Sequence, residues 1–199
     1  MNIWFATNNT HKKTELEAIL GSPLKIPSST SDGLSFNPDE TGATFYENAL
    51  IKARELQKFL KTNEPVIADD SGLCVDALDG RPGVLSARYG MTNGQKITSH
   101  EQNIKLLDEL GDSKVRTARF VCAMVLLLNN EQFFLVQETL EGEIVNKNEM
   151  KGDGGFGYDP VFFIPDFKRT LAELSADEKN AISHRGKAGK QIAKFLWQK

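Results

Sequence analysis

The first half of the chain alternates short apolar runs with segments of helical periodicity. Residues 2–7 form an apolar run that predicts a strand, and residues 13–20 carry apolar side chains at helical spacing. Thr44 and Glu47 have the spacing of a capping box, which predicts a helix that begins there and runs to about Lys61. Helices that alternate with strands in this way indicate an α/β architecture.

The second half contains two long apolar segments, 115–128 and 131–146, with a polar turn near Asn129 and Asn130 between them. Within residues 120–128 the apolar side chains occupy both faces of the expected strand. A strand that is buried on both faces is typical of the interior of a sheet. A hairpin here, together with the alternating first half, predicts a mixed sheet.

Shorter elements complete the pattern, and six more helices or strands are predicted from local signals. The apolar run at residues 66–68 predicts a buried strand that stops at Asp69 and Asp70. The other expected elements are a short strand at residues 24–27, a strand at residues 161–165, a helix opened by a capping box at Ser99 and Gln102, a helix opened by a third capping box at Ser175 and Glu178, and a last helix after Ser183.

Composition and charge exclude several classes of protein. The chain has 199 residues, of which 40% are hydrophobic and 26% charged, as in ordinary globular proteins. We expect one domain, or two small lobes, without a spanning segment of roughly 20 apolar residues and without a signal peptide. The net charge of −3 and the lack of a basic run argue against a general nucleic-acid binder.

Two cysteines, Cys74 and Cys122, lie in apolar, strand-like runs. This placement favours two buried thiols in a reducing cytoplasm, with a disulfide as the alternative.

A polar loop follows the first strand and leads into a helix. The side chains of Thr7, Asn8, Asn9 and Thr10 are polar, and Lys12 adds a positive charge. A helix N-terminus presents unpaired N–H groups and a partial positive charge, so this loop is a candidate anion site. The alternative is that Asn9 or Thr10 only caps the helix.

Asp69 and Asp70 are adjacent carboxylates, which repel each other unless a cation or a hydrogen-bond network offsets the repulsion. Glu40 is a possible third member of the group. Mg²⁺ prefers oxygen ligands and usually binds through one or two carboxylates plus substrate phosphates. The segment therefore indicates a magnesium site, with ordinary turn residues as the alternative.

A glycine-rich segment, GDGGFGYDP at residues 152–160, carries aromatic rings on which a base could stack. Phe156 and Tyr158 supply those rings, and the Asp159 carboxylate could accept hydrogen bonds from a base edge. The alternative is a hairpin corner with core aromatics.

Positive residues stand at the start of the last expected helix. Ser183 is a plausible N-cap, which places His184 and Arg185 in the first turn, where the helix dipole disfavours positive charge. Lys179 lies one turn earlier. The departure from the local rule indicates a site that requires donors, with a solvated basic helix end as the alternative.

Five stretches of the chain, in this order, resemble the inosine triphosphate pyrophosphatase family, also called XTP/dITP diphosphatases: FATNNTHKKTEL, ETGATFYENALIKA, IADDSGLCVDALDGRPGVLSARYG, GGFGYDPVFFIP and AELSADEKNAISHRGKA. The resemblance extends from residue 5 to about residue 188. It implies one ITPase-like α/β domain over residues 1–199, with two lobes, a long mixed β-sheet flanked by helices and an active-site cleft between the lobes. It also implies a cytoplasmic homodimer that requires Mg²⁺.

The implied reaction converts ITP, dITP or XTP, with water, to the monophosphate and pyrophosphate, which would clear deaminated purines from the nucleotide pool. Asp70 would be the catalytic residue and would bind the metal together with Glu40, and Asp69 would hold its neighbour or lie beneath it. The implied substrate-binding residues are Thr7, Asn8, Asn9, Thr10, His11 and Lys12 for the triphosphate, Ser71 beside the acid, Phe156, Gly157, Tyr158 and Asp159 for the nucleoside, and Lys179, His184 and Arg185 for the base.

Two details qualify this set. His11 stands where the family commonly has glycine, and Lys52 is a less certain phosphate contact. Two other functions fit the same motifs: a nucleotide pyrophosphatase with a different base preference, and a nucleotide-binding module without catalysis.

Overall fold

The protein is described by a computed structural model that covers residues 2–27, 36–60, 64–91, 94–129, 132–152 and 154–197. The chain divides into two compact units. Unit 1 comprises Met1–Ser71, Cys122–Glu138 and Ser183–Lys199, and unit 2 comprises Gly72–Val121 and Thr139–Ile182. The expected turn at Asn130 and helix end at Lys61 lie outside the described residues.

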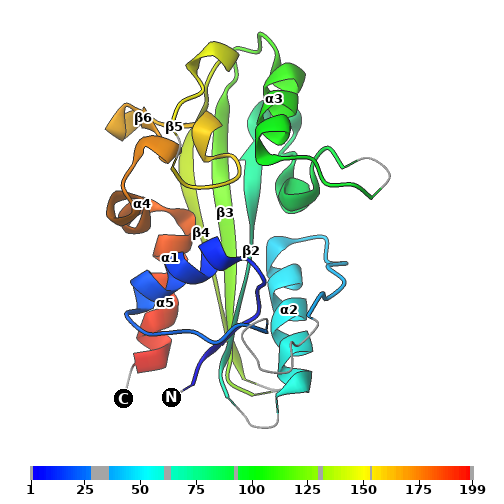
Figure 1. Ribbon diagram of the computed structural model, residues 1–199, viewed down its shortest axis with the longest axis vertical. Coiled ribbons are helices and arrows are strands. Elements are labelled where there is room, and N and C mark those ends of the chain that lie inside the picture. The colour runs from blue at the N-terminus through cyan, green and yellow to red at the C-terminus, as the bar shows by residue number, and fades with distance from the viewer. Residues whose placement is uncertain are drawn as a thin grey trace. The chain divides into compact units, whose positions relative to one another are not determined.

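The described strands form one six-stranded sheet whose order in space is their order along the chain (Figure 1). They are β1 (Trp4–Phe5), β2 (Val66–Val75), β3 (Thr117–Leu127), β4 (Phe133–Ile144), β5 (Phe162–Ile164) and β6 (Arg169–Thr170). β1 pairs with β2 in parallel, whereas β4 with β5 and β5 with β6 pair antiparallel. The predicted mixed α/β sheet is confirmed, and β3 lies in its interior.

Five α-helices occur among the described residues, three of them in unit 1. Unit 1 contains α1 (Thr10–Leu20), α2 (Phe45–Phe59) and α5 (His184–Trp197), and unit 2 contains α3 (Ser99–Leu110) and α4 (Ala176–Ile182). Short 3₁₀ turns connect several elements, among them Gly83–Arg88 and Asp159–Val161.

Unit 1 buries both faces of β1 and of its parts of β2 and β3, because apolar side chains fill successive positions of these strands. On one face Ile67 of β2 joins Leu16 of α1 and Ile192 of α5 in one core cluster. On the other face Val66 and its neighbours join Leu56 of α2 in a second cluster. Figure 1 shows α1 and α5 side by side and α2 on the other side of the strands.

The contact between α1 and α5 is close because α5 has a glycine at its centre. A Cβ atom at Gly189 would lie 2.9 Å from Ile19 Cγ2 and 3.1 Å from Leu16 Cδ1. These distances are shorter than ordinary van der Waals contacts. The absence of a side chain at position 189 therefore permits the observed spacing of the two helices.

Unit 2 has a single core cluster that covers one face of its part of the sheet. Leu73 and Val75 of β2 and Ala118 and Phe120 of β3 alternate with more exposed residues and pack, with Leu106 of α3, into this cluster. This alternation is typical of a strand with one buried face. The doubly buried run that the sequence predicted from residue 120 begins where β3 passes from unit 2 into unit 1.

Two predicted boundaries are wrong. β2 does not stop at the two acids but continues through them to Val75, so Asp69 and Asp70 lie inside a ten-residue strand. The expected strand at residues 24–27 is an isolated bridge between Trp4 and Lys25. Local propensity misjudged the end of β2, because Asp, Ser and Gly are frequent in turns and tertiary pairing overrides that tendency.

The predicted helix caps are mostly confirmed. Thr44 with Glu47 forms a capping box, and Ser175 with Glu178 exchanges the same two hydrogen bonds. The second box is displaced by one residue, because Thr98 and Glu101 form it in place of Ser99 and Gln102.

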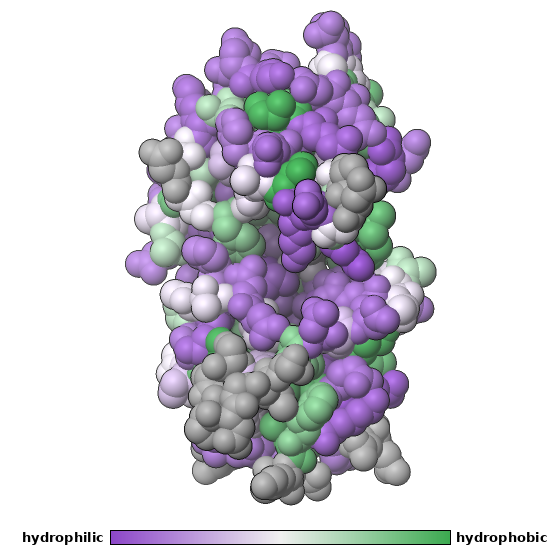
Figure 2. Space-filling view, turned by 45° about the vertical axis from the view of Figure 1, so that its right-hand side comes forward, coloured by the Kyte–Doolittle hydropathy of each residue, from purple (hydrophilic) through white to green (hydrophobic). Residues whose placement is uncertain are grey.

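Both cysteines are free thiols, and of the two only Cys122 is fully buried. None of the helices among the described residues is long and apolar enough to cross a membrane. Figure 2 shows a mainly polar face on which apolar residues occur in small, separate patches.

Candidate active site

In unit 1, Asp69 and Asp70 point to opposite faces of β2 because successive side chains of a strand alternate. Asp69 lies on the side of α1 and α5, as Ile67 does. Asp70 lies on the side of α2, as Val66 and Ala68 do. The two carboxylates therefore have separate sets of partners, which is how the strand accommodates two adjacent acids.

Asp69 is bound by two cations. Lys12 Nζ of α1 lies 3.0 Å from Asp69 Oδ1, and Arg185 of α5 donates to Asp69 Oδ2 from Nε at 3.2 Å and from Nη2 at 3.0 Å. The same guanidinium donates to Glu15 Oε2 at 2.6 Å and to Ser71 Oγ at 2.8 Å. Asp69 and Arg185 are 1% and 2% exposed, so the central ion pair of this network is fully buried.

The electrostatics of this network keep Asp69 charged. Burial alone would raise the pKa of Asp69, but attraction to Lys12 and Arg185 outweighs it and holds the pKa well below its usual value. Burial lowers the pKa of Lys12, since desolvation exceeds the attraction to Asp69. The Cys122 thiol lies beside Asp69, and burial raises its pKa to about 12.

Asp70 is bound by residues of α2. Lys52 Nζ lies 2.8 Å from Asp70 Oδ1 and 3.3 Å from Glu40 Oε1, and Asn48 Nδ2 donates to Asp70 Oδ2 at 3.3 Å. Glu40 therefore belongs to the same cluster, as predicted. Burial raises the pKa of Asp70 despite the neighbouring Lys52. Burial would lower the pKa of Lys52, but the attraction of Asp70, Asp69 and Glu40 raises it instead.

Within the polar loop, Asn9 is the N-cap of α1. Asn9 Oδ1 accepts from the N–H groups of His11 at 2.9 Å and Lys12 at 3.2 Å, and Asn9 N–H donates to Thr7 Oγ1 at 3.1 Å. Asn8 Nδ2 donates to the Phe36 carbonyl at 2.5 Å. The capping interpretation is thus confirmed, and the contacts of Thr7, Asn8, Asn9, Thr10, His11 and Lys12 with a triphosphate stay a prediction.

In unit 2, three of the predicted nucleoside and base residues form a small polar cluster. Lys179 Nζ lies 2.7 Å from Asp159 Oδ2, which also accepts from the Phe156 N–H at 2.8 Å. The Lys179 ammonium lies 4.7 Å from the centroid of the Phe156 ring, a cation–π contact. Lys179 and Asp159 are 6% and 3% exposed, so the pair is buried.

The backbone of this segment is held by residues that the sequence motifs did not single out. Asn103 of α3 donates from Nδ2 to the Gly157 carbonyl at 3.1 Å, and Tyr158 Oη donates to the Ser86 carbonyl at 2.9 Å. Asn103 Oδ1 is buried without a hydrogen-bond partner in the part of the chain that the structure describes. Gly157 has φ +65°, a left-handed conformation that glycine adopts without strain.

His184 and Arg185 occupy the first turn of α5 in unit 1, as predicted. Ser183 Oγ accepts from the Gly186 N–H at 2.9 Å, which confirms Ser183 as the N-cap. Both positive side chains are buried rather than solvated, at 5% and 2% exposure. Their contact with a base stays a prediction, and the structure adds that Arg185 organises Asp69.

The sequence motifs did not identify Asn48 and Glu15 as site residues. The position of Asn48 on the buried face of α2 could have revealed it. Asn48 and Lys52 are four residues apart and fall within the buried stripe of α2, beside Ala49, Ala53 and Leu56. Polar side chains on an otherwise apolar helix face require buried partners. Glu15 gives no such signal, because its partner Arg185 is 170 positions away.

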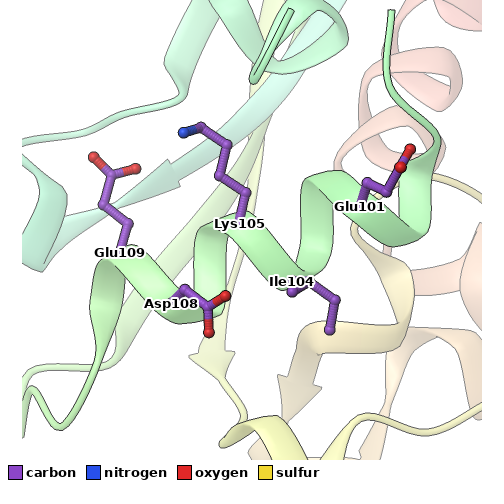
Figure 3. Close-up of a pocket in the computed structure, with 5 residues that line it drawn as sticks. All are labelled: Glu101, Ile104, Lys105, Asp108 and Glu109. Carbon is purple, nitrogen blue, oxygen red and sulfur yellow. The ribbon is translucent and has the colours of Figure 1, made fainter.

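A surface pocket in unit 2 lies on α3 and is lined by Glu101, Ile104, Lys105, Asp108 and Glu109. Figure 3 shows that Lys105 and Glu109 point to one side of the helix and Ile104 and Asp108 to another. None of these five residues is a predicted site residue, and Glu109 is engaged by Arg81 and Tyr89. The pocket offers no arrangement for nucleotide chemistry.

Comparison with known proteins gives consistent relatives along the whole chain. A family model described as the Ham1 family matches residues 3–195. A dITP/XTP pyrophosphatase of Treponema denticola is 48% identical, covering 98% of both chains, and one of Halalkalibacterium halodurans is 45% identical, covering 98% of this chain and 100% of its own.

Solved structures agree with these relatives. The Staphylococcus aureus Ham1 protein matches with a TM-score of 0.83 at 38% identity, and a HAM1 protein from Coxiella burnetii with 0.81 at 39%. Each comparison covers 98% of both chains.

Proposed function

The chain belongs to the Ham1 family, and we propose that it is a nucleoside triphosphate pyrophosphohydrolase that converts dITP, ITP and XTP to the monophosphate and pyrophosphate. Family membership agrees with the resemblance carried by the five sequence stretches. The chain is thus a hydrolase of acid anhydride bonds. The observation that carries the proposal is the cluster on the α2 side of β2, where Asp70, Lys52 and Glu40 are held together.

The residues of unit 1 suit the triphosphate chemistry. Such reactions need positioning and electrostatic stabilisation more than covalent help. Lys12 and the N-terminus of α1 would bind phosphate oxygens, and Lys52 would add a second ammonium group. Asp70 would orient the attacking water or accept its proton, and its position inside a strand fixes the carboxylate for that task.

The donor set fits Mg²⁺. Asp70 and Glu40 both lie within ion-pair distance of the single Lys52 ammonium, so one cation can reach both carboxylates. The described residues contain no group of three or more His, Cys, Asp or Glu side chains able to hold a metal. Mg²⁺ does not need one, since it binds through one or two carboxylates plus substrate phosphates. When bound, Mg²⁺ supplies neutralisation of phosphate charge.

The residues of unit 2 suit the nucleoside. Phe156 offers a ring for base stacking, and Lys179 offers a donor that would satisfy the 6-oxo group of hypoxanthine or xanthine. Adenine carries an amino donor at that position, so ATP would place donor against donor, which is costly in a buried site. We assign this selection to Lys179 first, because its ammonium lies 4.7 Å from the centroid of the Phe156 ring and pairs with Asp159, whereas Arg185 donates to Asp69, Glu15 and Ser71.

The decisive experiment identifies the products from ITP, dITP, XTP, GTP and ATP, with Mg²⁺ and with EDTA. We expect monophosphate and pyrophosphate from the first three, much less from ATP, and no turnover in EDTA. Release of orthophosphate would contradict the reaction. Tight ITP binding without hydrolysis would favour a non-catalytic module, and turnover mainly of pyrimidine nucleotides would favour another base preference.

A second experiment tests the base contact with a matched control. Lys179→Met should lower kcat/KM for ITP about tenfold or more while changing the value for ATP little, since the lost hydrogen bond is to a charged donor. Arg169→Gln removes one positive charge from the same unit, where Arg169 pairs with the exposed Glu178, and should change neither. Equal losses on ITP and ATP in Lys179→Met would refute the role.

The homodimer is part of the same proposal. Sedimentation equilibrium should give twice the mass of one chain, and a monomer at micromolar concentration would contradict it.

A further inference from the structure

Lys52 lies where a bound cation would contact the carboxylates of unit 1. Its ammonium is 2.8 Å from Asp70 Oδ1 and 3.3 Å from Glu40 Oε1, and the residue is only 7% exposed. These two oxygens are the ones that would hold Mg²⁺ in the proposed function. An ammonium and a divalent ion a few ångströms apart repel strongly in a partly buried site, so the two cations exclude each other.

Asp70 and the segment that carries Glu40 are held by bonds that do not depend on Lys52. Asn48 Nδ2 donates to Asp70 Oδ2, and Asn48 Oδ1 accepts from the Gly42 N–H at 2.8 Å. This second bond joins the segment that carries Glu40 to α2. A Cβ at Gly42 would lie 2.7 Å from Asn48 Oδ1, so the approach requires glycine. Asp70 and the Glu40 segment therefore keep a fixed position if the lysine moves.

The side chain of Lys52 is built to exchange partners. Its ammonium ends a four-carbon stem and has three rotatable donors, so it can exchange one set of oxygens for another. Triphosphate oxygens would offer such a set. A fixed Asp70 and a fixed Glu40 segment, combined with a movable cation, are the arrangement that an exchange requires.

We propose that Lys52 holds the place of the divalent cation in the nucleotide-free protein and transfers to the substrate phosphates when they bind. The exchange links the two binding events: affinity for the metal is low until the triphosphate draws the lysine away. The metal then enters with, or after, the nucleotide. This inference rests on the metal site of the proposed function and adds to it the order in which its components assemble.

The test measures Mn²⁺ binding to the nucleotide-free protein by electron paramagnetic resonance and calorimetry. Lys52→Gln removes the competing charge and should bind Mn²⁺ about tenfold more tightly, or better, than the wild type. Lys52→Arg keeps the charge and should show no gain. Lys12→Gln is the matched control, because it removes the same charge from a lysine that pairs with Asp69, and its gain should be clearly smaller. Equal or weaker binding by Lys52→Gln would overturn the inference.

The outcomes separate this inference from the proposed function. If the wild type and Lys52→Gln bind Mn²⁺ equally, and Asp70→Asn abolishes that binding, the metal site stands and the exchange is refuted. If neither protein binds Mn²⁺, even with a non-hydrolysable ITP analogue present, the metal assignment fails and the exchange fails with it.

A second measurement uses the wild type alone, in case Lys52→Gln does not fold. In ¹⁵N-lysine-labelled protein, the Lys52 Nζ resonance should be little changed by millimolar Mg²⁺ and should shift when the ITP analogue is added with Mg²⁺. Loss or displacement of the signal by Mg²⁺ alone would contradict the proposed order.

Discussion

Asp69 and Asp70 are consecutive residues of β2, yet their carboxylates have different surroundings on the two faces of this strand. On the α1 and α5 side, Asp69 is completely buried between Lys12 and Arg185, and its pKa is held far below the usual value. On the α2 side, Asp70 faces Lys52, Asn48 and Glu40, and its pKa is raised by burial. Two acids with the same side chain thus differ in the balance between desolvation and attraction to cations.

The difference teaches how one strand can hold a structural and a chemical carboxylate side by side. The oxygens of Asp69 face two cations and a serine, so its negative charge is compensated within the network. Asp70 shares its cation with Glu40, so the pair has more negative than positive charge. We therefore expect replacement of Asp69 to act on stability and replacement of Asp70 to act on turnover.

The largest effect is expected for Asp69→Asn, which removes the carboxylate shared by Lys12 and Arg185 and leaves Glu15 as the acid partner of the buried Arg185. Breaking a buried ion pair by removing one member typically costs about 3–5 kcal/mol. Urea unfolding at pH 7 should show a loss of this size. If the free energy of unfolding of the variant lies within about 1 kcal/mol of the wild-type value, Asp69 does not have the proposed structural role, because a loss that small is close to that of ordinary surface changes.

The contribution of Asp69 to the free energy of unfolding should also depend on pH, in a direction that its pKa determines. Since the native pKa of Asp69 lies below the value of about 3.9 for an unfolded aspartate, its contribution is present above about pH 4 and is lost as the pH falls through the native value. The stability difference between the wild type and Asp69→Asn should therefore shrink in acid. A difference that grows as the pH falls would contradict the assignment.

Asp70→Asn comes next and should show the opposite profile. Turnover of ITP should fall by more than about a hundredfold, because the carboxylate that would activate water and bind the metal in the proposed function is lost. Unfolding free energy should change much less than in Asp69→Asn, since Lys52 keeps Glu40 as a partner. Pyrophosphate release and urea unfolding measure the two quantities, and wild-type turnover would remove Asp70 from the mechanism.

Glu15→Gln tests how much the second acid beside Arg185 contributes to stability on the Asp69 side of β2. Glu15 is the second acid of Arg185 and is more exposed than Asp69, at 16% of its side chain. Glutamine still offers an oxygen, so the loss of unfolding free energy should be about 1 kcal/mol. Thermal and urea unfolding measure it, and a loss as large as that of Asp69→Asn would show that Glu15 shares the central role.

The smallest effect concerns the thiols and leaves function unchanged. Burial raises the pKa of Cys122, beside Asp69, to about 12, so almost no thiolate exists at pH 8. Burial also raises the pKa of Cys74, but this residue is partly exposed. Iodoacetamide at pH 8 should label Cys74 first and Cys122 only after unfolding, as mass spectrometry can follow. Early labelling of Cys122 would show that the Asp69 side opens in the native protein.

Local signals in the sequence predicted much of this architecture. The capping residues Thr44, Ser175 and Ser183 and the doubly apolar run of β3 each follow from rules that operate over a few residues. The grouping of Asp70 with Glu40 was also predicted, from the preference of Mg²⁺ for carboxylate oxygens, and the family resemblance implies the same pair.

The partners of the acids could not be predicted in the same way. Lys12 and Arg185 reach Asp69 across 57 and 116 positions, and no pattern in their own neighbourhoods specifies that contact. The continuation of β2 through Asp69–Gly72 could not be predicted for the same reason. The cations that permit charged residues in a central strand come from helices that are distant in the sequence. If the sequence analysis had extended β2 through the acids, the alternation of side chains along a strand would have placed Asp69 and Asp70 on opposite faces.

Gly189 connects the helix packing of unit 1 to its charges. α1 carries Lys12 and Glu15, α5 carries Arg185, and the closeness of the two helices depends on the missing side chain. A larger residue at position 189 would wedge the helices apart and lengthen ion pairs that it does not touch. Tolerance to mutation on this side of the protein therefore depends on helix spacing as much as on charge. Even alanine at position 189 would weaken the ion pairs of Asp69 without contacting them.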